Sequence, residues 1–160
     1  MPSPIQLLDD PLIESVIARA KSHPRLRMNH NFHAAADDNP HRFLNVLVQG
    51  TYCPPHRHKT PPKSEAFVIL RGQVGLLIFS EAGEVSEVHR LGENGVWGID
   101  LEPGIWHTIV ALSPVAVCYE VKPGPWDPST DKEFAPWAPL EGASEASAYL
   151  AWLNECVRDA

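Results

Sequence analysis

Two histidines separated by one residue, His56 and His58, are the strongest chemical signal in the sequence. In a β-strand, residues i and i+2 point to the same face, so this spacing places two imidazoles side by side. Glu65 opens the next apolar run, and His107 enters a later run directly after a Pro-Gly turn. Three neutral imidazoles and one carboxylate suit a divalent metal ion such as zinc, iron, nickel or manganese. The pattern predicts a metal site with coordination positions left open for water or substrate.

Short strands must position these residues. Runs rich in apolar and β-branched residues, separated by glycine and proline, predict strands at residues 43–49, 65–70, 73–79, 85–91, 95–99, 105–111 and 115–121. Only Arg71 and Gly72 separate the second run from the third, so we expect these two runs to form a hairpin. If Glu65 faces the interior, Phe67 and Ile69 do so too, because side chains alternate along a strand. The pattern indicates an antiparallel β-sandwich or β-barrel.

Helices are expected near both ends of the chain. Asp10 is the expected N-cap of the first helix, with Pro11 at its first position, and Pro24 ends it. The last helix opens at Ser144, where apolar residues recur at helical spacing. The length of 160 residues fits one structural domain. Its expected parts are an N-terminal helix and arm at 1–42, a β-barrel at 43–122, and a wrapping segment with the C-terminal helix at 123–160.

Composition narrows the partners. A formal net charge of −7 and the lack of a basic stripe argue against nucleic acid or an anionic membrane surface. The cysteines Cys53, Cys118 and Cys156 show no CxxC spacing, which favours a reduced, cytoplasmic chain. No stretch approaches the roughly 18–20 apolar residues that a membrane span needs. We therefore expect a small polar molecule as the partner.

The spacing around the histidines resembles a known superfamily. Two stretches carry the resemblance, namely Gly50-x5-His56-x-His58 with Glu65-x6-Gly72, and Gly104-x2-His107. The first resembles the first cupin motif, and the second resembles the core of the second cupin motif. Cupins are jelly-roll β-barrels that hold a metal ion with three histidines and one glutamate. The resemblance implies that fold here, with those four residues as the ligands.

Further stretches narrow the resemblance. They are Arg27-Met-Asn-His-Asn-Phe-His33, Pro55-His-Arg-His58, Trp106-His-Thr108, Val121-Lys-Pro-Gly-Pro125 and Asp131-Lys-Glu-Phe-Ala-Pro-Trp-Ala-Pro139. Together they resemble the WbuC-type cupin-fold metalloproteins over nearly the whole chain. Those proteins are associated with O-antigen and other surface-polysaccharide gene clusters, and the family implies no firmly assigned reaction.

The sequence departs from the usual cupin pattern between the second histidine and the glutamate. Cupins usually have fewer residues there than the six found here, Lys59 to Ser64. Because this insertion contains a Pro-Pro pair and proline cannot donate to a strand ladder, we expect it to loop out. Glu65 keeps its spacing to Gly72. Ala111 stands where cupins usually have asparagine after the third histidine.

The arm at residues 25–41 holds a second group of polar residues. On one interpretation it lines the mouth of the pocket, where Asn29 and Asn31 contact substrate hydroxyls and His30 and His33 are the catalytic residues that transfer a proton. On the other, the arm pairs with the sheet and its polar groups are hydrogen-bonded there.

Three cations and one apolar strand carry further expectations. Arg27, Arg42 and Lys63 are candidates to bind a phosphate or carboxylate of the substrate, although such residues are often solvated surface charges. The run at 65–70 is apolar on both faces, so its outer face needs a cover. The N-terminal helix, the C-terminal segment or a second copy in a homodimer can supply it.

Three functions fit these observations. The first is a metal-dependent enzyme of the isomerase or epimerase type that acts on a sugar or sugar nucleotide in surface-polysaccharide metabolism. The sugar link comes from the WbuC-type resemblance alone. The second is an iron-dependent dioxygenase that uses the open coordination positions. The third is a non-catalytic module that binds or senses a carbohydrate through its metal. A fold does not decide among them.

Overall fold

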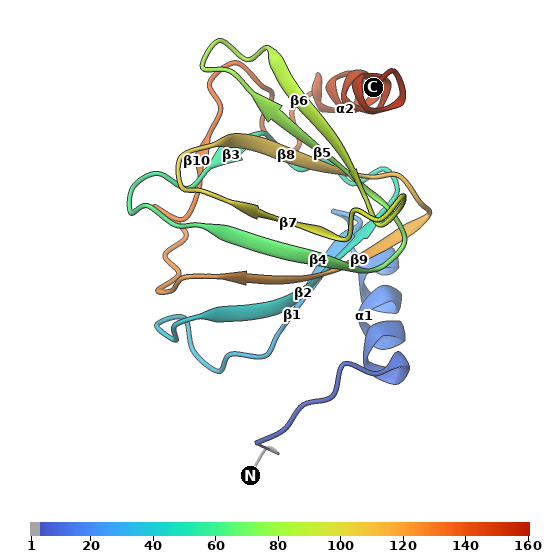
Figure 1. Ribbon diagram of the computed structural model, residues 1–160, viewed down its shortest axis with the longest axis vertical. Coiled ribbons are helices and arrows are strands. Elements are labelled where there is room, and N and C mark those ends of the chain that lie inside the picture. The colour runs from blue at the N-terminus through green and yellow to red at the C-terminus, as the bar shows by residue number, and fades with distance from the viewer. Residues whose placement is uncertain (1–3) are drawn as a thin grey trace.

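The computed structural model describes residues 4–160, so residues 1–3 of the expected N-terminal segment lie outside the described residues. Two five-stranded antiparallel sheets face each other (Figure 1). Helix α1 (Asp10–Ser22) packs on the first sheet, and helix α2 (Ala146–Arg158) packs on the second. The predicted mostly-β architecture with a helix near each end is confirmed.

Strand order shows how the sheets are built. The first sheet has the order β1 (Arg27–Asn31), β2 (His41–Val48), β9 (Val115–Lys122), β4 (Glu65–Arg71) and β7 (Gly98–Leu101). The second has the order β10 (Glu133–Phe134), β3 (His56–Arg57), β8 (Trp106–Ala111), β5 (Val74–Phe79) and β6 (Val85–Leu91). The edge strands β6 and β7 do not pair with each other, and residues such as Ile78 and Ile99 line the gap between them. The sheets therefore form an open sandwich and not a closed barrel.

Alternation along the strands places one set of side chains between the sheets. Leu47, Phe67, Leu76 and Cys118 are buried in this core, each less than 6% exposed. Burying such apolar side chains contributes about 1.5–3 kcal/mol each, which holds the two sheets together. Because Glu65 shares the face of Phe67 on β4, its carboxylate also points inward, as the sequence predicts.

The expected hairpin at Gly72 is wrong. β4 and β5 belong to different sheets, and the hairpin partner of β5 is β6. Gly72 has a φ of 74°, and a Cβ there would lie 2.2 Å from the carbonyl oxygen of Val115. A short glycine turn between two apolar strands can fold back within one sheet or cross to the facing sheet. Here the chain crosses, so that both strands bury one face in the common core.

The flanking elements differ slightly from expectation. Asp9 caps α1, and its carboxylate accepts a hydrogen bond from the backbone N–H of Leu12, so the cap lies one residue before the expected Asp10. Helix α2 begins at Ala146, two residues after the expected Ser144. Part of the arm pairs with the sheet as the edge strand β1, which is the second of the two interpretations of that segment. Neither α1 nor α2 has the length and apolar character needed to cross a membrane.

Candidate metal centre

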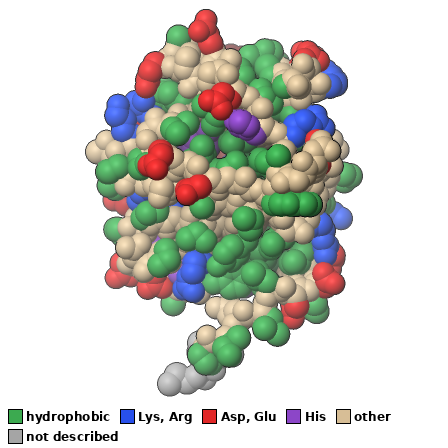
Figure 2. Space-filling model, viewed as in Figure 1, with side chains coloured by type: hydrophobic (Ala, Val, Ile, Leu, Met, Phe, Trp, Pro, Cys, Tyr) green, Lys and Arg blue, Asp and Glu red, His purple; other side chains and the backbone are tan. Residues whose placement is uncertain are grey.

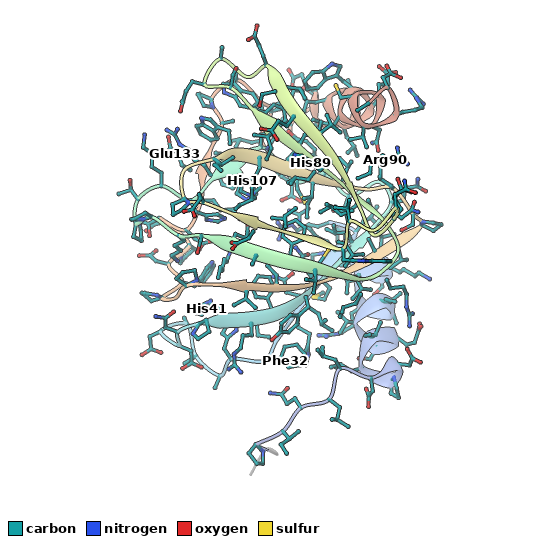
Figure 3. All side chains as sticks on the ribbon, viewed as in Figure 1. Phe32, His41, His89, Arg90, His107 and Glu133 are labelled. Carbon is teal, nitrogen blue, oxygen red and sulfur yellow. The ribbon has the colours of Figure 1, made fainter. Side chains whose placement is uncertain are left out.

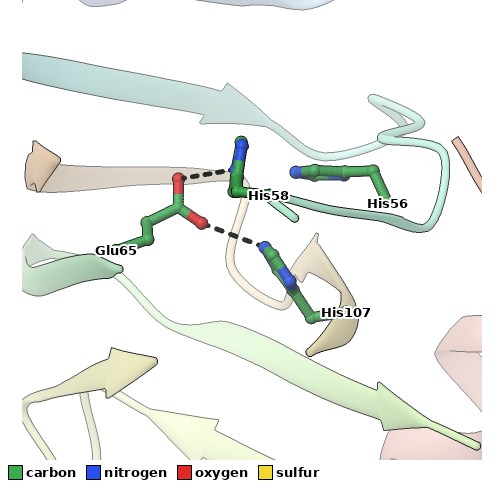
Figure 4. Close-up of side chains that lie close together, drawn as sticks. All are labelled: His56, His58, Glu65 and His107. Carbon is green, nitrogen blue, oxygen red and sulfur yellow. Dashed lines mark hydrogen bonds and ion pairs between the residues drawn. The ribbon is translucent and has the colours of Figure 1, made fainter. Parts of the chain in front are cut away.

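Both sheets contribute to a cluster of three imidazoles and one carboxylate. His56 in β3 and His107 in β8 are direct cross-strand partners, with ring centroids 4.6 Å apart. His58 follows β3 immediately, and Glu65 opens β4 in the opposite sheet. One ligand atom from each residue lies within 4.8 Å of the other three (Figure 4). All four residues are buried, at 3–7% exposure.

The side chain between the two histidines points the other way. The Arg57 guanidinium lies 4.1 Å from the centroid of the Trp106 ring, on the outer side of the second sheet, and forms an ion pair with Glu133 at 2.7 Å. In Figure 3, His107 and Glu133 lie on the left of the view and Arg90 lies on the right. The alternation predicted from the two-residue spacing therefore places both imidazoles inside.

Backbone carbonyls set the tautomer of each histidine. The Nδ1 atoms of His56 and His107 lie 2.9 Å from the carbonyl oxygens of Pro54 and Ile105, and Nδ1 of His58 contacts the carbonyl oxygen of Asp131. A carbonyl oxygen only accepts, so each Nδ1 must carry the proton and donate it. Each Nε2 then keeps a lone pair, which is the arrangement of a metal-ligating histidine.

The carboxylate of Glu65 faces two of these Nε2 atoms. Its Oε2 lies 3.0 Å from Nε2 of His107, and its Oε1 lies 3.7 Å from Nε2 of His58. The Nε2 of His58 is buried and has no hydrogen-bond partner among the described residues. Since lone pairs repel a carboxylate, a proton or a metal ion must lie between them. The unpartnered nitrogen and the donor set show that the cluster can hold a divalent metal ion.

Electrostatics keep the ligands in the forms that a metal needs. Burial, and then the ammonium of Lys132, hold the pKa of His56 well below its usual value, so this imidazole is neutral. Burial acts to raise the pKa of Glu65, but the hydrogen bond with Glu120 and the adjacent imidazoles of His107 and His58 outweigh it and hold that pKa well below the usual range. Burial and the adjacent charge of Glu65 raise the pKa of Glu120, so Glu120 keeps the shared proton.

Two buried lysines form ion pairs next to the cluster. Asp131 receives the ammonium groups of Lys63 at 3.2 Å and Lys122 at 3.3 Å, and Lys122 also lies 3.8 Å from the Glu65 carboxylate. All of these side chains are less than 10% exposed. The same Asp131 residue supplies the carbonyl that orients His58. This network therefore fixes both the orientation of a ligand and the charge around Glu65.

A cavity of about 470 Å³, called the main cavity below, opens beside the cluster. His56, Glu65 and His107 line one side of it, while Asn45 and Glu120 face it from β2 and β9. The amide of Asn45 donates to the Glu120 carboxyl group at 3.1 Å. A volume in the usual range of ligand sites, about 300–1,000 Å³, makes the cavity suitable for a small polar molecule.

The cavity also contains part of the arm that the sequence singled out. Arg27 and Asn29 line it, because both lie on the face of β1 that looks toward the facing sheet. Arg27 donates to Thr51 and to the carbonyl of Tyr52, which fix its position. Asn31 instead lines a second cavity of about 530 Å³, which meets the first at Asn29.

The structure does not bring His30 and His33 to the metal cluster. His30 points to the opposite face of β1 from Asn29, with its ring 5.0 Å from that of Phe32. His33 stacks on His41 at 3.9 Å. Both line the second cavity, which none of the four candidate ligands lines. Their catalytic roles stay predictions.

The two other predicted substrate contacts also lie away from the main cavity. Arg42 is exposed and lines neither of these two cavities. Lys63 is 4% exposed and forms a buried ion pair with Asp131, so it stabilises the surroundings of the cluster and does not face the cavity. Among the three cations chosen from the sequence, Arg27 alone lines the cavity beside the cluster.

Several cavity residues were missed in the sequence. Asn45 and Glu120 had a detectable signal, because each is a polar residue at an inward position within a mainly apolar stretch of its strand. Lys132 and Phe134 had none. They reach the cavity because the segment after β9 pairs with β3 as strand β10, and no local pattern predicts that long-range pairing.

A two-sheet antiparallel sandwich with this His/Glu cluster between its sheets is the architecture of a cupin. The chain belongs to the family described as a domain of unknown function (DUF6016), whose model matches residues 8–91. No curated protein matches the chain.

Solved structures with the same fold support that class. One is the capsular polysaccharide assembling protein CapF from Staphylococcus aureus, with 20% identity, a TM-score of 0.58 and 70% of this chain covered. The chain spans only 32% of that protein. Another is the L-ribose isomerase of Cellulomonas parahominis with L-ribose, with 16% identity, a TM-score of 0.54 and 72% of each chain covered. A third is a cupin 2 domain-containing protein from Halorhodospira halophila, with 12% identity, a TM-score of 0.50 and 84% and 82% covered. At these identities the likeness shows the cupin fold.

Proposed function

We propose that this chain is a metal-dependent enzyme that acts on a sugar or sugar nucleotide in surface-polysaccharide metabolism, by isomerisation or epimerisation. One observation carries the proposal: three inward Nε2 lone pairs and the ionised Glu65 converge beside an open cavity. Zinc, iron, nickel and manganese all suit this donor set. A divalent ion held by His56, His58, Glu65 and His107 would polarise a carbonyl or hydroxyl oxygen as a Lewis acid.

The walls of the cavity suit a molecule with several hydroxyl groups. Asn29 and Asn45 offer amide donors and acceptors, and the carboxyl group of Glu120 lies between Asn45 and the cluster. Phe67 and Phe134 supply apolar surface in the same cavity. A few polar groups on such an apolar surface can fix the orientation of a bound sugar.

Further support for a sugar comes from the proteins that share the fold. One of them carries the name of a capsular polysaccharide assembling protein, and another is an L-ribose isomerase. The WbuC-type resemblance points to the same area of metabolism. For this chain the substrate is our proposal, since a shared fold does not carry a shared reaction.

Elemental analysis of the full chain, purified without added metal, tests the metal site. We expect near-stoichiometric metal in the wild type and its loss in a His56→Ala/His58→Ala variant. His89→Ala is the matched control, because His89 is exposed and pairs only with Glu87. Equally low metal in the wild type and the double variant would contradict the proposal.

Turnover of a sugar-nucleotide panel by the metal-loaded chain tests the reaction. We expect an isomerised or epimerised product that the double variant does not form. Binding of a panel member without product would favour the carbohydrate-binding module. Oxygen uptake by the iron-loaded protein would favour the dioxygenase.

A homodimer in the cytoplasm is a further part of the proposal. Val68 and Leu70 on the outer face of β4 are 46% and 42% exposed, and nearby Trp97 is 64% exposed. Figure 2 shows hydrophobic side chains gathered across the lower centre of that view, over the first sheet. Helix α1 packs on β1 and β2 of the same sheet and leaves these side chains exposed, so a second copy would bury them. Light scattering that shows a monomer at micromolar concentration would contradict the dimer.

A further inference from the structure

Three cations gather at the entrance of the main cavity. Arg25 precedes β1, Arg27 opens it, and Lys132 lies directly before β10. All three line the main cavity and also an adjoining cavity of about 220 Å³, and His56 lines both. In a chain with a formal net charge of −7, such a local gathering of positive charge is a specific feature of this opening.

Lys132 has no counter-ion in the part of the chain that the structure describes. Its neighbours in sequence are both acidic, but Asp131 is held by Lys63 and Lys122, and Glu133 is held by Arg57. The Lys132 residue is exposed at the opening. It lines both cavities together with His56, one of the candidate metal ligands. The charge is therefore close to the candidate metal ligands and available to a ligand.

The two arginines share one carboxylate. Glu141 lies 2.9 Å from Arg25 and 2.8 Å from Arg27. Because Arg27 is also held by Thr51 and by the carbonyl of Tyr52, its guanidinium stays in place whether or not Glu141 does. Among the described residues that line the smaller cavity, Glu141 is the one acidic side chain against these three cations, which leaves an excess of positive charge there for an incoming anion.

We propose that the ligand of this cavity carries an oxyanion, a carboxylate or a phosphate, which binds Lys132 and Arg27 while the rest of the molecule reaches toward Glu65. The inference rests on the proposed function for the end of the ligand that meets the cluster. Guanidinium and ammonium groups form charge-assisted hydrogen bonds with such oxyanions. The substrate class is thus an anionic sugar, either a sugar acid or a sugar phosphate, and a neutral sugar lacks one of the two anchors.

The sharing of Glu141 gives the inference a distinctive consequence. In the ligand-free chain this carboxylate competes with the incoming oxyanion for Arg25 and Arg27. Its replacement by the neutral isostere, Glu141→Gln, should tighten the binding of an anionic sugar and leave that of a neutral sugar unchanged. A purely structural role for these ion pairs predicts weaker or unchanged binding of both.

Calorimetric titration of the metal-loaded full chain with glucose, glucuronate, glucose 1-phosphate, acetate and inorganic phosphate tests this. We expect at least one of the two anionic sugars to bind about tenfold or more tightly than glucose, with a preference that falls as salt rises. The comparison of glucuronate with glucose 1-phosphate, and of acetate with phosphate, distinguishes a sugar acid from a sugar phosphate. Lys132→Met should remove most of the preference, and Lys59→Met, at an exposed lysine that lines none of the cavities described above, should keep it.

Two results would overturn the inference. One is equal affinity for glucose and its anionic derivatives, including no measurable binding of any anionic probe. The other is an anion preference that survives Lys132→Met. Metal content, measured on the same samples, separates this inference from the proposed function. Metal-free wild type that still prefers anions through Lys132 would contradict the proposed function alone, whereas metal-loaded protein without an anion preference would contradict this inference alone.

Discussion

Replacement of Asp131 by asparagine tests the charge network behind the cluster. This carboxylate, 5% exposed, accepts Lys63 on one oxygen and Lys122 on the other, and both ammonium groups are less than 10% exposed. Asparagine keeps the size of the side chain and removes its charge. Two buried ammonium groups then face a neutral amide, and Lys63 has no other acidic partner among the described residues.

The size of the effect follows from the cost of an uncompensated buried charge. Removing one partner of a buried ion pair destabilises a protein by about 3–5 kcal/mol. Lys122 keeps part of its compensation, because the ionised Glu65 lies 3.8 Å away. We therefore expect about 3 kcal/mol for Asp131→Asn, the lower end of that range. Such a loss raises the ratio of unfolded to folded chain roughly a hundredfold.

Urea denaturation of the full chain measures this loss. Asp127→Asn is the matched control, because that carboxylate is exposed and accepts only from Ser129, and it should change stability by less than about 0.5 kcal/mol. The double variant Asp131→Asn/Lys63→Met should recover part of the loss, since it also removes one of the stranded ammonium groups. A loss below about 1 kcal/mol for Asp131→Asn would refute the reasoning, because it would mean that water or rearrangement compensates both lysines.

Three further predictions concern pH, the sheet crossing and the second helix. Lys122, His58 and Lys63 hold the pKa of Asp131 below its usual value despite its burial. The stability that Asp131 contributes is therefore full above about pH 4 and is lost as pH falls through the folded pKa. The urea midpoints of the wild type and of Asp131→Asn should converge in acid, and a constant difference between them would contradict this. Gly72→Ala should cost about 1–3 kcal/mol or more in urea unfolding, because its φ is 74° and the new Cβ would meet the Val115 carbonyl, whereas Gly95→Ala, also at positive φ but with open space around it, should cost less. Leu153→Ala in α2, where the side chain is fully buried, should cost about 2–5 kcal/mol with metal content unchanged, and a loss of metal would show that α2 supports the cluster directly.

Local patterns predicted that the four candidate ligands lie together, because each signal is short-range. The alternation of a strand places His56 and His58 on one side of Arg57, and Phe67 and Glu65 on one face of β4. These relations hold whichever sheet each strand joins. The structure accordingly brings all four candidate ligands within 4.8 Å of one another, although the hairpin expected at Gly72 is a crossing between sheets.

For the arm at residues 25–41, local patterns did not predict which way each side chain points. Its polar residues were treated as one group, but an edge strand divides them between two faces. Arg27 and Asn29 line the main cavity, while His30 lies against Phe32. The same alternation that located the ligands would have divided the arm, had the segment been recognised as a strand. Its sequence offers little apolar periodicity by which to do so.

The burial of the charged residues around the cluster could not have been predicted from each residue separately. Lys63 and Asp131 each look like surface residues in the sequence, because an isolated charge inside a protein costs several kcal/mol. They are buried only because the segment after β9 pairs with β3 and brings Asp131 onto Lys63 and Lys122. That pairing also places Lys132 at the opening, while its acidic neighbours Asp131 and Glu133 form ion pairs with other cations. The long-range contact which completes the support of His58 is therefore the one that leaves a free positive charge beside the cavity, so the metal site and the proposed anion site depend on the same segment.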